Sequence, residues 1–184
     1  VVNGNTTGPG GVVYFSGTGT VTNCNFTGNS ATKRGGAVYF EGTGTVTNCN
    51  FTDNTATYGG AVFFEGTGTA INCNFINNTA SIKGGALVFA DLQSYSKATN
   101  CNFINNSALG DGAIGSANRY FVIADTCIFK TNSDTRSAVI RSPTLNVDDF
   151  TTFYGSGEKL TFDLKTNSSI PVPNGNISIS VYFK

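Results

Sequence analysis

The sequence contains no histidine, no methionine and no tryptophan, and only 11 basic and 11 acidic residues among its 184. Because the two signs balance, the chain lacks the basic stripe that nucleic-acid binding requires, and we expect no nucleic-acid partner. No apolar run approaches the roughly 18–20 residues needed to span a bilayer, so we expect no membrane span in this segment. The opening residues, Val1-Val2-Asn3-Gly4-Asn5, read as the middle of a pattern, and we expect a segment of a longer protein.

What the sequence does have is repetition, and its fixed points are five cysteines. They are Cys24, Cys49, Cys73, Cys101 and Cys127, at intervals of 25, 24, 28 and 26 residues. A phenylalanine follows each cysteine by two residues: Phe26, Phe51, Phe75, Phe103 and Phe129. An asparagine follows each by five residues: Asn29, Asn54, Asn78, Asn106 and Asn132. A box of small residues precedes each: Gly10-Gly11-Val12, Gly35-Gly36-Ala37, Gly59-Gly60-Ala61, Gly84-Gly85-Ala86 and Asp111-Gly112-Ala113. Five copies with shared anchors indicate a repeat protein.

Each copy alternates with the period of a β-strand. Val38, Phe40 and Val46 fall on one face, while Tyr39 and Glu41 fall on the other,. Burying a glutamate without a partner is costly, so the first face is expected to point inward.

Three corners interrupt the alternation, at Thr47-Asn48, at Asp53-Asn54 and near Tyr58-Gly59-Gly60. Glycine permits the backbone angles that a corner needs. Three short strands and three corners in about 25 residues describe one coil of a parallel β-helix. We therefore predict an all-β fold, a right-handed parallel β-helix of about five coils of 24–28 residues.

Stacking such coils at roughly 4.8 Å places like residues over like and turns the Cys, Phe and Asn columns into internal ladders. Stacked asparagine amides are expected to hydrogen-bond along the axis and so to satisfy polar groups inside the corners. The cysteine ladder suggests a metal site or a chain of disulfides as one alternative. Its spacing matches no zinc pattern, however, and free cysteine packs like a small hydrophobe. We favour reduced, inert core cysteines, with no metal and no cofactor.

The repeat decays after Cys127, and we divide the chain into β-helix repeats over 1–147 and a second segment over 148–184. This C-terminal segment alternates in the manner of the first strands of an immunoglobulin-like sandwich. About 37 residues cannot close such a sandwich, which takes roughly seven strands,.

Phe-x-x-Asn followed by Gly-Gly-Ala-(Ile/Leu/Val) resembles the repeats of chlamydial polymorphic outer-membrane proteins. The chain is more similar still to adhesin-like surface proteins of methanogenic archaea, which follow such repeats with immunoglobulin-like modules. The start of those modules resembles Tyr154-Gly155-Ser156-Gly157-Glu158-Lys159-Leu160-Thr161-Phe162. The resemblance implies an extracellular protein, attached at the cell surface, that contacts other cells, glycans or proteins. Asp111-Gly112-Ala113-Ile114 departs from the family's double glycine.

An enzyme is the first alternative, because many β-helices are polysaccharide lyases or hydrolases. Glu41 and Glu65 fall in register, roughly 5 Å apart if stacked, a spacing that superficially suits a retaining glycosidase. They are equivalent members of one repeat, however, without the different environments that separate acid from base. A solvated charge column is favoured, and a shared cation is a hypothesis that calcium titration would test.

The outward aromatic column is the candidate binding site. Tyr14, Tyr39 and Phe63 are expected to align beside Glu41 and Glu65. Exposed aromatics rimmed by polar groups are suited to holding sugars or protein partners. The alternative is that this run is covered by a loop or a neighbouring module.

Two further surface patterns are present. Thr-Gly-Thr recurs in three coils (Thr18/Thr20, Thr43/Thr45 and Thr67/Thr69), which raises an ice-binding hypothesis that a thermal-hysteresis measurement would test, although threonine is ordinary on exposed strands,. Glycosylation triplets occur at Asn5, Asn25, Asn50, Asn77, Asn105, Asn167 and Asn176,.

Taken together, the sequence favours a non-enzymatic, adhesin-like surface segment. The rival from another class is a structural subunit of an extracellular filament, a homopolymer joined by β-strand addition at open helix ends.

Overall fold

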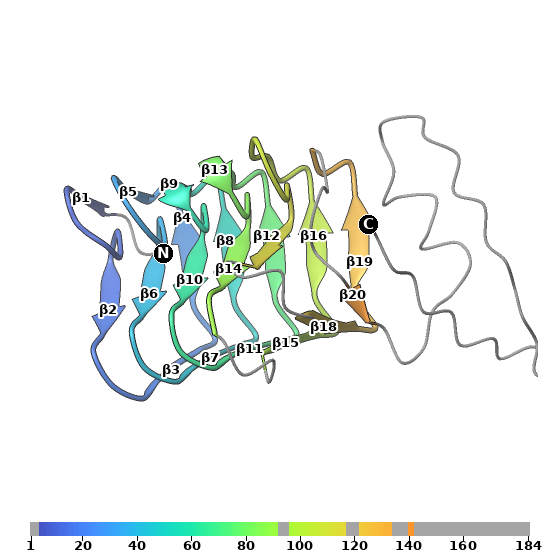
Figure 1. Ribbon diagram of the computed structural model, residues 1–184, viewed down its shortest axis with the longest axis horizontal. Helices are drawn as coiled ribbons and strands as arrows, with labels where there is room; N and C mark the ends of the chain where they lie inside the picture. Colours follow the sequence, from blue (N-terminus) through green and yellow to red (C-terminus); the bar gives the residue numbers. More distant parts are fainter. Residues whose placement is uncertain (1–3, 92–95, 117–121, 134–139, 142–184) are drawn as a thin grey trace, which may run out of the picture.

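The computed structural model describes residues 4–91, 96–116, 122–133 and 140–141 (Figure 1). Strands in this part of the chain form four parallel sheets that run along one axis. The predicted segment 148–184, the boundary at 147, and Asn167 and Asn176 lie outside the described residues.

The four sheets are named I to IV in the order in which the chain visits them. Sheet I contains β1 (Asn5–Thr6), β5 (Ser30–Ala31), β9 (Thr55–Tyr58) and β13 (Thr79–Lys83). Sheet II contains β2 (Val13–Phe15), β6 (Val38–Phe40), β10 (Val62–Phe64), β14 (Leu87–Phe89) and β17 (Ile114–Ser116). Sheet III contains β3 (Gly19–Thr22), β7 (Gly44–Thr47), β11 (Gly68–Ile71), β15 (Lys97–Thr99), β18 (Val122–Asp125) and β20 (Ile140–Arg141). Sheet IV contains β4 (Asn25–Thr27), β8 (Asn50–Thr52), β12 (Asn74–Ile76), β16 (Asn102–Ile104) and β19 (Ile128–Lys130).

Successive strands of a sheet belong to successive repeats, paired in register, so each repeat is one coil of a parallel β-helix. The predicted fold class is therefore confirmed. Within the described residues, no helix is both long and apolar enough to span a membrane.

Each full coil has four strands, where the sequence predicted three. The expected single strand from Val38 to Thr47 is two strands, β6 and β7, with a bend between them. The bend brings Gly44 under the ring of Phe40, so close that a Cβ on Gly44 would lie 2.4 Å from the Phe40 Cγ. Because the bend spans three residues, Phe40 and Val46 still both face inward, and alternation alone could not reveal it.

The three predicted corners are present, and each contains a residue with left-handed backbone angles. In the second full coil these are Asn48 at φ 53°, Asp53 at φ 56° and Gly59 at φ 62°. Asparagine, aspartate and glycine are the residues that adopt this conformation most readily. The repeat therefore carries a suitable residue at every corner of this coil.

The three internal ladders also form as predicted. Consecutive rings of the Phe26 column stack with centroids 4.9–5.1 Å apart, and a second column, which runs from Phe15 to Phe89, stacks at 5.0–5.2 Å. The backbone nitrogen of Cys49 lies 3.5 Å from the Cys73 Sγ. The asparagine column is buried from Asn29 to Asn106, partly exposed at Asn132, and hydrogen-bonded from coil to coil.

Candidate functional site

The predicted outward column lies on sheet II. Tyr14, Tyr39, Phe63 and Val88 pair directly from one strand to the next. The rings of Tyr14 and Tyr39 stack with centroids 5.3 Å apart, and Phe63 is tilted by 45° against Tyr39. Tyr39, Phe63 and Val88 form a cluster separate from the core inside the coils, and Tyr14 is exposed, so the outward direction of the column is confirmed.

Their expected exposure is wrong for two of the three aromatic residues. Tyr14 is 50% exposed, whereas Tyr39 is 4% and Phe63 is 5% exposed. Side chains at the sheet I edge cover them: Tyr58 packs against this cluster, and the Arg34 guanidinium lies over the Phe63 ring at 5.1 Å. Tyr39 and Phe63 are therefore covered by side chains of the same chain, and only Tyr14 is exposed.

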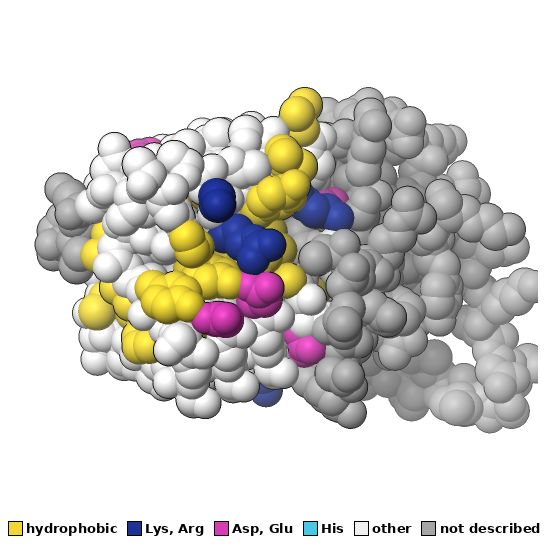
Figure 2. Space-filling view, turned by 60° about the vertical axis from the view of Figure 1, so that its left-hand side comes forward, with side chains coloured by type: hydrophobic (Ala, Val, Ile, Leu, Met, Phe, Trp, Pro, Cys, Tyr) yellow, Lys and Arg dark blue, Asp and Glu magenta, His cyan; other side chains and the backbone are white. Residues whose placement is uncertain are grey.

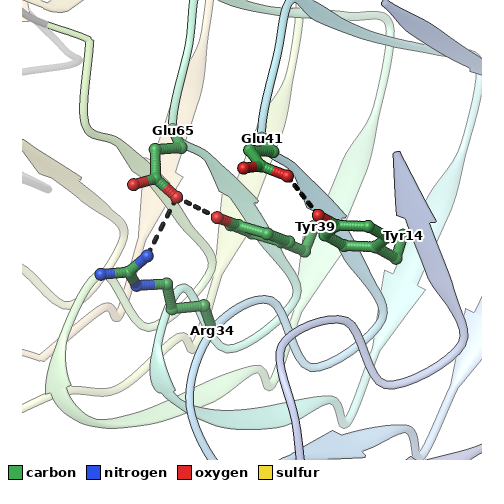
Figure 3. Close-up of polar contacts among 5 residues, drawn as sticks. All are labelled: Tyr14, Arg34, Tyr39, Glu41 and Glu65. Atoms are coloured by element: carbon green, nitrogen blue, oxygen red, sulfur yellow. Dashed lines mark hydrogen bonds and ion pairs between the residues drawn. The ribbon is translucent and has the colours of Figure 1, made fainter. Parts of the chain in front are cut away.

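Glu41 and Glu65 are exposed, and each lies two residues after the outward aromatic residue of its own coil. Each accepts a hydrogen bond from the tyrosine of the preceding coil (Figure 3). The Tyr14 hydroxyl donates to Glu41, and the Tyr39 hydroxyl donates to Glu65. Burial, followed by this hydrogen bond, raises the pKa of Tyr39 to about 12. In the next coil the position of the glutamate is occupied by Ala90. The aromatic residue of the preceding coil that would donate to it is Phe63, which has no hydroxyl.

The two glutamates are nevertheless not equivalent, contrary to the expectation from the repeat. The Arg34 Nη1 lies 2.9 Å from the Glu65 Oε2, in an ion pair whose side chains are 43% and 42% exposed. No ion pair joins Glu41 to any residue in the described part of the chain. The sequence repeat aligns the glutamates but did not reveal Arg34, which belongs to the preceding coil.

A second charged pair lies further along the same side. Asp111 occupies the corner position of Gly59 and Gly84, with φ 55°, and is 1% exposed. The Lys83 Nζ lies 3.4 Å from the Asp111 Oδ2 and donates to the Ser116 carbonyl at 2.6 Å. The sequence singled out Asp111 as a departure from the double glycine, but its partner lies in a different repeat.

Hydrophobic side chains gather with charged ones of both signs on this side of the helix, amid a mostly uncharged polar surface (Figure 2). We call this surface, made by Tyr14, Arg34, Glu41, Tyr58 and Glu65, the aromatic face. On this face the half-exposed Tyr14 ring lies beside carboxylates of which only Glu65 pairs with a cation among the described residues.

The predicted glycosylation triplets within the described residues are accessible. Asn5, Asn25, Asn50, Asn77 and Asn105 are all exposed. Two of them have their amide nitrogen engaged, because the Asn50 Nδ2 donates to the Asn25 Oδ1 at 2.8 Å and the Asn105 Nδ2 donates to the Asn77 Oδ1 at 2.8 Å. A glycan on either nitrogen would have to replace that hydrogen bond.

The threonine array of sheet III is short. Thr20, Thr45 and Thr69 pair in register, and the next position is Lys97. No group of three His, Cys, Asp or Glu residues suited to a metal ion occurs in the residues that the structure covers.

The cysteine ladder is buried from Cys49 to Cys127, while Cys24 at its end is partly exposed, and all five are free thiols. Each thiol donates to the carbonyl two residues earlier, as from the Cys73 Sγ to the Ile71 oxygen at 3.1 Å. The adjacent Cys101 thiol, together with burial, raises the pKa of Cys73 to about 12. For Cys49, Cys73 and Cys101 the raised pKa favours the neutral thiol.

Four in-register sheets, corner residues and stacked ladders together describe a complete solenoid repeat, and comparison with known families agrees. Residues 2–168 match the family described as the right handed beta helix region. The chain belongs to this right-handed β-helix family. Neither the curated proteins nor the solved structures contain a significant match. The β-helix protein therefore shares its fold with the family, and its own surface residues indicate its function.

Proposed function

We propose that the β-helix protein is a non-enzymatic, adhesin-like segment of an archaeal cell-surface protein, which contacts other cells, glycans or proteins through the aromatic face. The observation that carries this proposal is the combination on that face of a half-exposed Tyr14 with an exposed Glu41 carboxylate. An amphipathic ring beside a charged acceptor is suited to a partner that is partly apolar and partly polar.

The hydrogen bonding of the acidic residues supports a binding role over a catalytic one. Glu41 and Glu65 each accept a tyrosine hydroxyl from the preceding coil, and each therefore links two coils. A glycosidase needs one carboxyl group held neutral as acid and another held ionised. Although Arg34 pairs with Glu65 alone, both carboxylates accept a tyrosine hydrogen bond, and no contact among the described residues marks either of them as a proton donor.

Adhesion tests this proposal directly. Whole cells and a glycan array are probed with the wild-type protein and with Tyr14→Ala, which removes an exposed ring without opening the core. The matched control is Thr45→Ala, on the outer side of neighbouring sheet III. Loss of adhesion in Tyr14→Ala alone supports the proposal, and equal binding by the wild type, Tyr14→Ala and Thr45→Ala would contradict it.

A filament subunit joined by β-strand addition is the second candidate. Among the described residues, strands β1, β2, β3 and β4 are each the outermost strand of their sheet. Unpaired strand edges recruit strands from other chains. Mass measurement in solution separates the candidates, since a filament subunit forms concentration-dependent oligomers and an isolated binding segment remains monomeric.

A further inference from the structure

One position of the repeat determines what covers the aromatic face. It is the residue immediately before the left-handed corner that follows sheet I, and its members are Pro9, Arg34, Tyr58, Lys83 and Gly110. Strand bridges and pairing join Arg34 to Tyr58, Tyr58 to Lys83 and Lys83 to Gly110. Pro9 belongs to the same column because it directly precedes the corner glycine Gly10. The Gly10 nitrogen donates to the Arg34 carbonyl at 2.8 Å, as the Gly35 nitrogen donates to the Tyr58 carbonyl at 3.0 Å.

A long side chain at this position reaches onto the following coil. Arg34 extends over Phe63 at 5.1 Å and pairs with Glu65 at 2.9 Å. Lys83 reaches the Ser116 carbonyl at 2.6 Å. Within the protein itself, an outward aromatic ring and the glutamate beside it thus bind a guanidinium group, that of Arg34.

The preceding coil has the same acceptor without the cation. Glu41 accepts the hydroxyl of Tyr14 just as Glu65 accepts that of Tyr39, as the two dashed bonds in Figure 3 show. The residue that would correspond to Arg34 is Pro9, which carries no charge and cannot reach the carboxylate. Both Glu41 and Tyr14 are exposed.

We propose that Glu41 and Tyr14 bind an arginine side chain of a partner protein. This inference rests on the proposed function and names the partner chemistry for the same face. A guanidinium group is planar, stacks on aromatic faces and donates to carboxylates through two parallel N–H groups. Because Tyr39 is only 4% exposed, the incoming guanidinium lies on the Tyr14 ring, which is 50% exposed.

The charge pattern favours a protein partner over a neutral glycan. A cation over an aromatic ring and an ion pair near the surface are each weak alone, so the arginine is one anchor of a larger contact. A neutral sugar would use the Tyr14 ring and donate hydroxyl hydrogen bonds to Glu41, but it carries no positive charge to pair with the carboxylate. A partner arginine pairs with Glu41 as Arg34 pairs with Glu65, and it stacks on Tyr14 because Tyr39, the ring that corresponds to Phe63, is buried.

The test is an NMR titration of the whole chain with the peptide acetyl-Gly-Gly-Arg-Gly-Gly-amide and with its citrulline counterpart, which is neutral but of nearly the same shape. We expect the arginine peptide to shift the Tyr14 and Glu41 signals saturably and the citrulline peptide to bind at least about fivefold more weakly. Glu41→Gln is expected to weaken arginine binding by about the same factor.

Two further variants act in opposite directions. Pro9→Arg supplies the missing cation within the chain, at high effective concentration, and is expected to abolish peptide binding that its control Pro9→Ala retains. Arg34→Ala removes the guanidinium group that lies on Phe63 and pairs with Glu65. The peptide is then expected to cause a second set of saturable shifts, at Phe63 and Glu65. If Pro9→Arg does not fold, Glu41→Gln and Arg34→Ala still decide.

The inference is overturned if citrulline binds as well as arginine, if Glu41→Gln changes nothing, or if Arg34→Ala gains no second site. If these fail while cell or glycan adhesion still depends on Tyr14, the arginine partner is wrong and the proposed function stands. If adhesion is also independent of Tyr14, both proposals fall.

Discussion

The side-chain nitrogen of Asn54 donates to the Oδ1 of Asn78, one coil further along the helix, at 3.0 Å. The same oxygen accepts the backbone N–H of Asn54, also at 3.0 Å, while the Asn78 Nδ2 donates to the Phe51 carbonyl at 3.0 Å. Both side chains are fully buried. One amide therefore satisfies three polar groups of the preceding coil, in a place that water does not reach.

Asn78→Ala is expected to lower the free energy of unfolding by about 3 kcal/mol or more, because it leaves several buried donors and acceptors without partners at about 1–3 kcal/mol each. The measurement is urea denaturation followed by circular dichroism. The control is Asn74→Ala, in the partly exposed outer ladder, where the Asn74 Nδ2 donates to the Asn50 Oδ1 at 2.7 Å. Water replaces that bond, so we expect a loss of no more than about 1 kcal/mol. Similar losses in both variants would show that burial of the inner ladder does not matter.

Gly60→Ala is expected to disrupt the stacking of coils. A Cβ on Gly60 would lie 2.1 Å from the carbonyl oxygen of Gly85 in the next coil and 2.6 Å from that of Thr79. Backbone cannot yield as a flexible side chain does, so the loss should reach about 3 kcal/mol or prevent folding. The yield of soluble protein and its urea midpoint give the answer.

The control for this substitution is Gly17→Ala, since a Cβ there has nothing within 4 Å. Replacing glycine in an unstrained position reduces the entropy of the unfolded chain, and we expect no change or a gain of up to about 1 kcal/mol. A Gly60→Ala protein as stable as Gly17→Ala would mean that the coils are further apart than the structure has them.

These glycines and asparagines explain why the fold was readable from the sequence. A residue such as Gly60 or Asn78 recurs because each coil imposes the same backbone contact on the next, so the period directly reports the stacking. The fourth strand of the coil was missed because the bend after Phe40 preserves the inward and outward alternation.

The aromatic face was predicted only in part, for a related reason. The alignment of Tyr39 with Phe63 follows from the repeat, but their cover does not. Arg34 and Tyr58 lie at the edge of sheet I rather than on sheet II, and Arg34 covers Phe63 of the following coil, so no single copy of the repeat contains both that ring and its cover. The signal that was available is the variation at the residue before each corner glycine.

Thr126→Asn is expected to stabilise the protein. Thr126 has φ 50°, at the corner where the other coils carry Asn23, Asn48, Asn72 and Asn100 with φ between 51° and 56°. A β-branched residue is strained in the left-handed region, whereas asparagine is tolerated there. We expect a gain of about 1 kcal/mol in the free energy of unfolding.

The control is Thr22→Asn, on an exposed strand position of β3 that needs no left-handed angles. Asparagine is depleted in strands, so the expected change is zero or slightly destabilising. Thermal melts of the two variants check the difference, and a Thr126→Asn protein that melts below wild type would argue against strain at this corner.

The cysteine ladder predicts that stability falls on the alkaline side, starting at pH 9. The pKa of Cys101, like that of Cys73, is raised from 9.0 to about 12 by the adjacent thiol of the next coil and by burial. A pKa that is higher in the folded state means that folding favours the protonated thiol. This contribution is complete below pH 9, where unfolded thiols are protonated, and it is lost as the pH rises towards 12. Cys127 has its pKa lowered by Cys101 and acts in the opposite sense.

Urea midpoints measured from pH 7 to 12 separate the thiols from the tyrosines. Tyr39 has a pKa raised from 10.0 to about 12, so its own contribution begins to decline only at pH 10. Between pH 9 and 10 the decline belongs to the cysteines, and the double variant Cys73→Ala/Cys101→Ala should be flatter in that interval although less stable at pH 7. Tyr39→Phe, which keeps the ring and removes the hydroxyl, should leave the decline from pH 9 to 10 intact and reduce the decline above pH 10. A wild-type midpoint that stays constant from pH 9 to 10 would show that the buried thiols ionise as readily in the folded protein as in the unfolded chain.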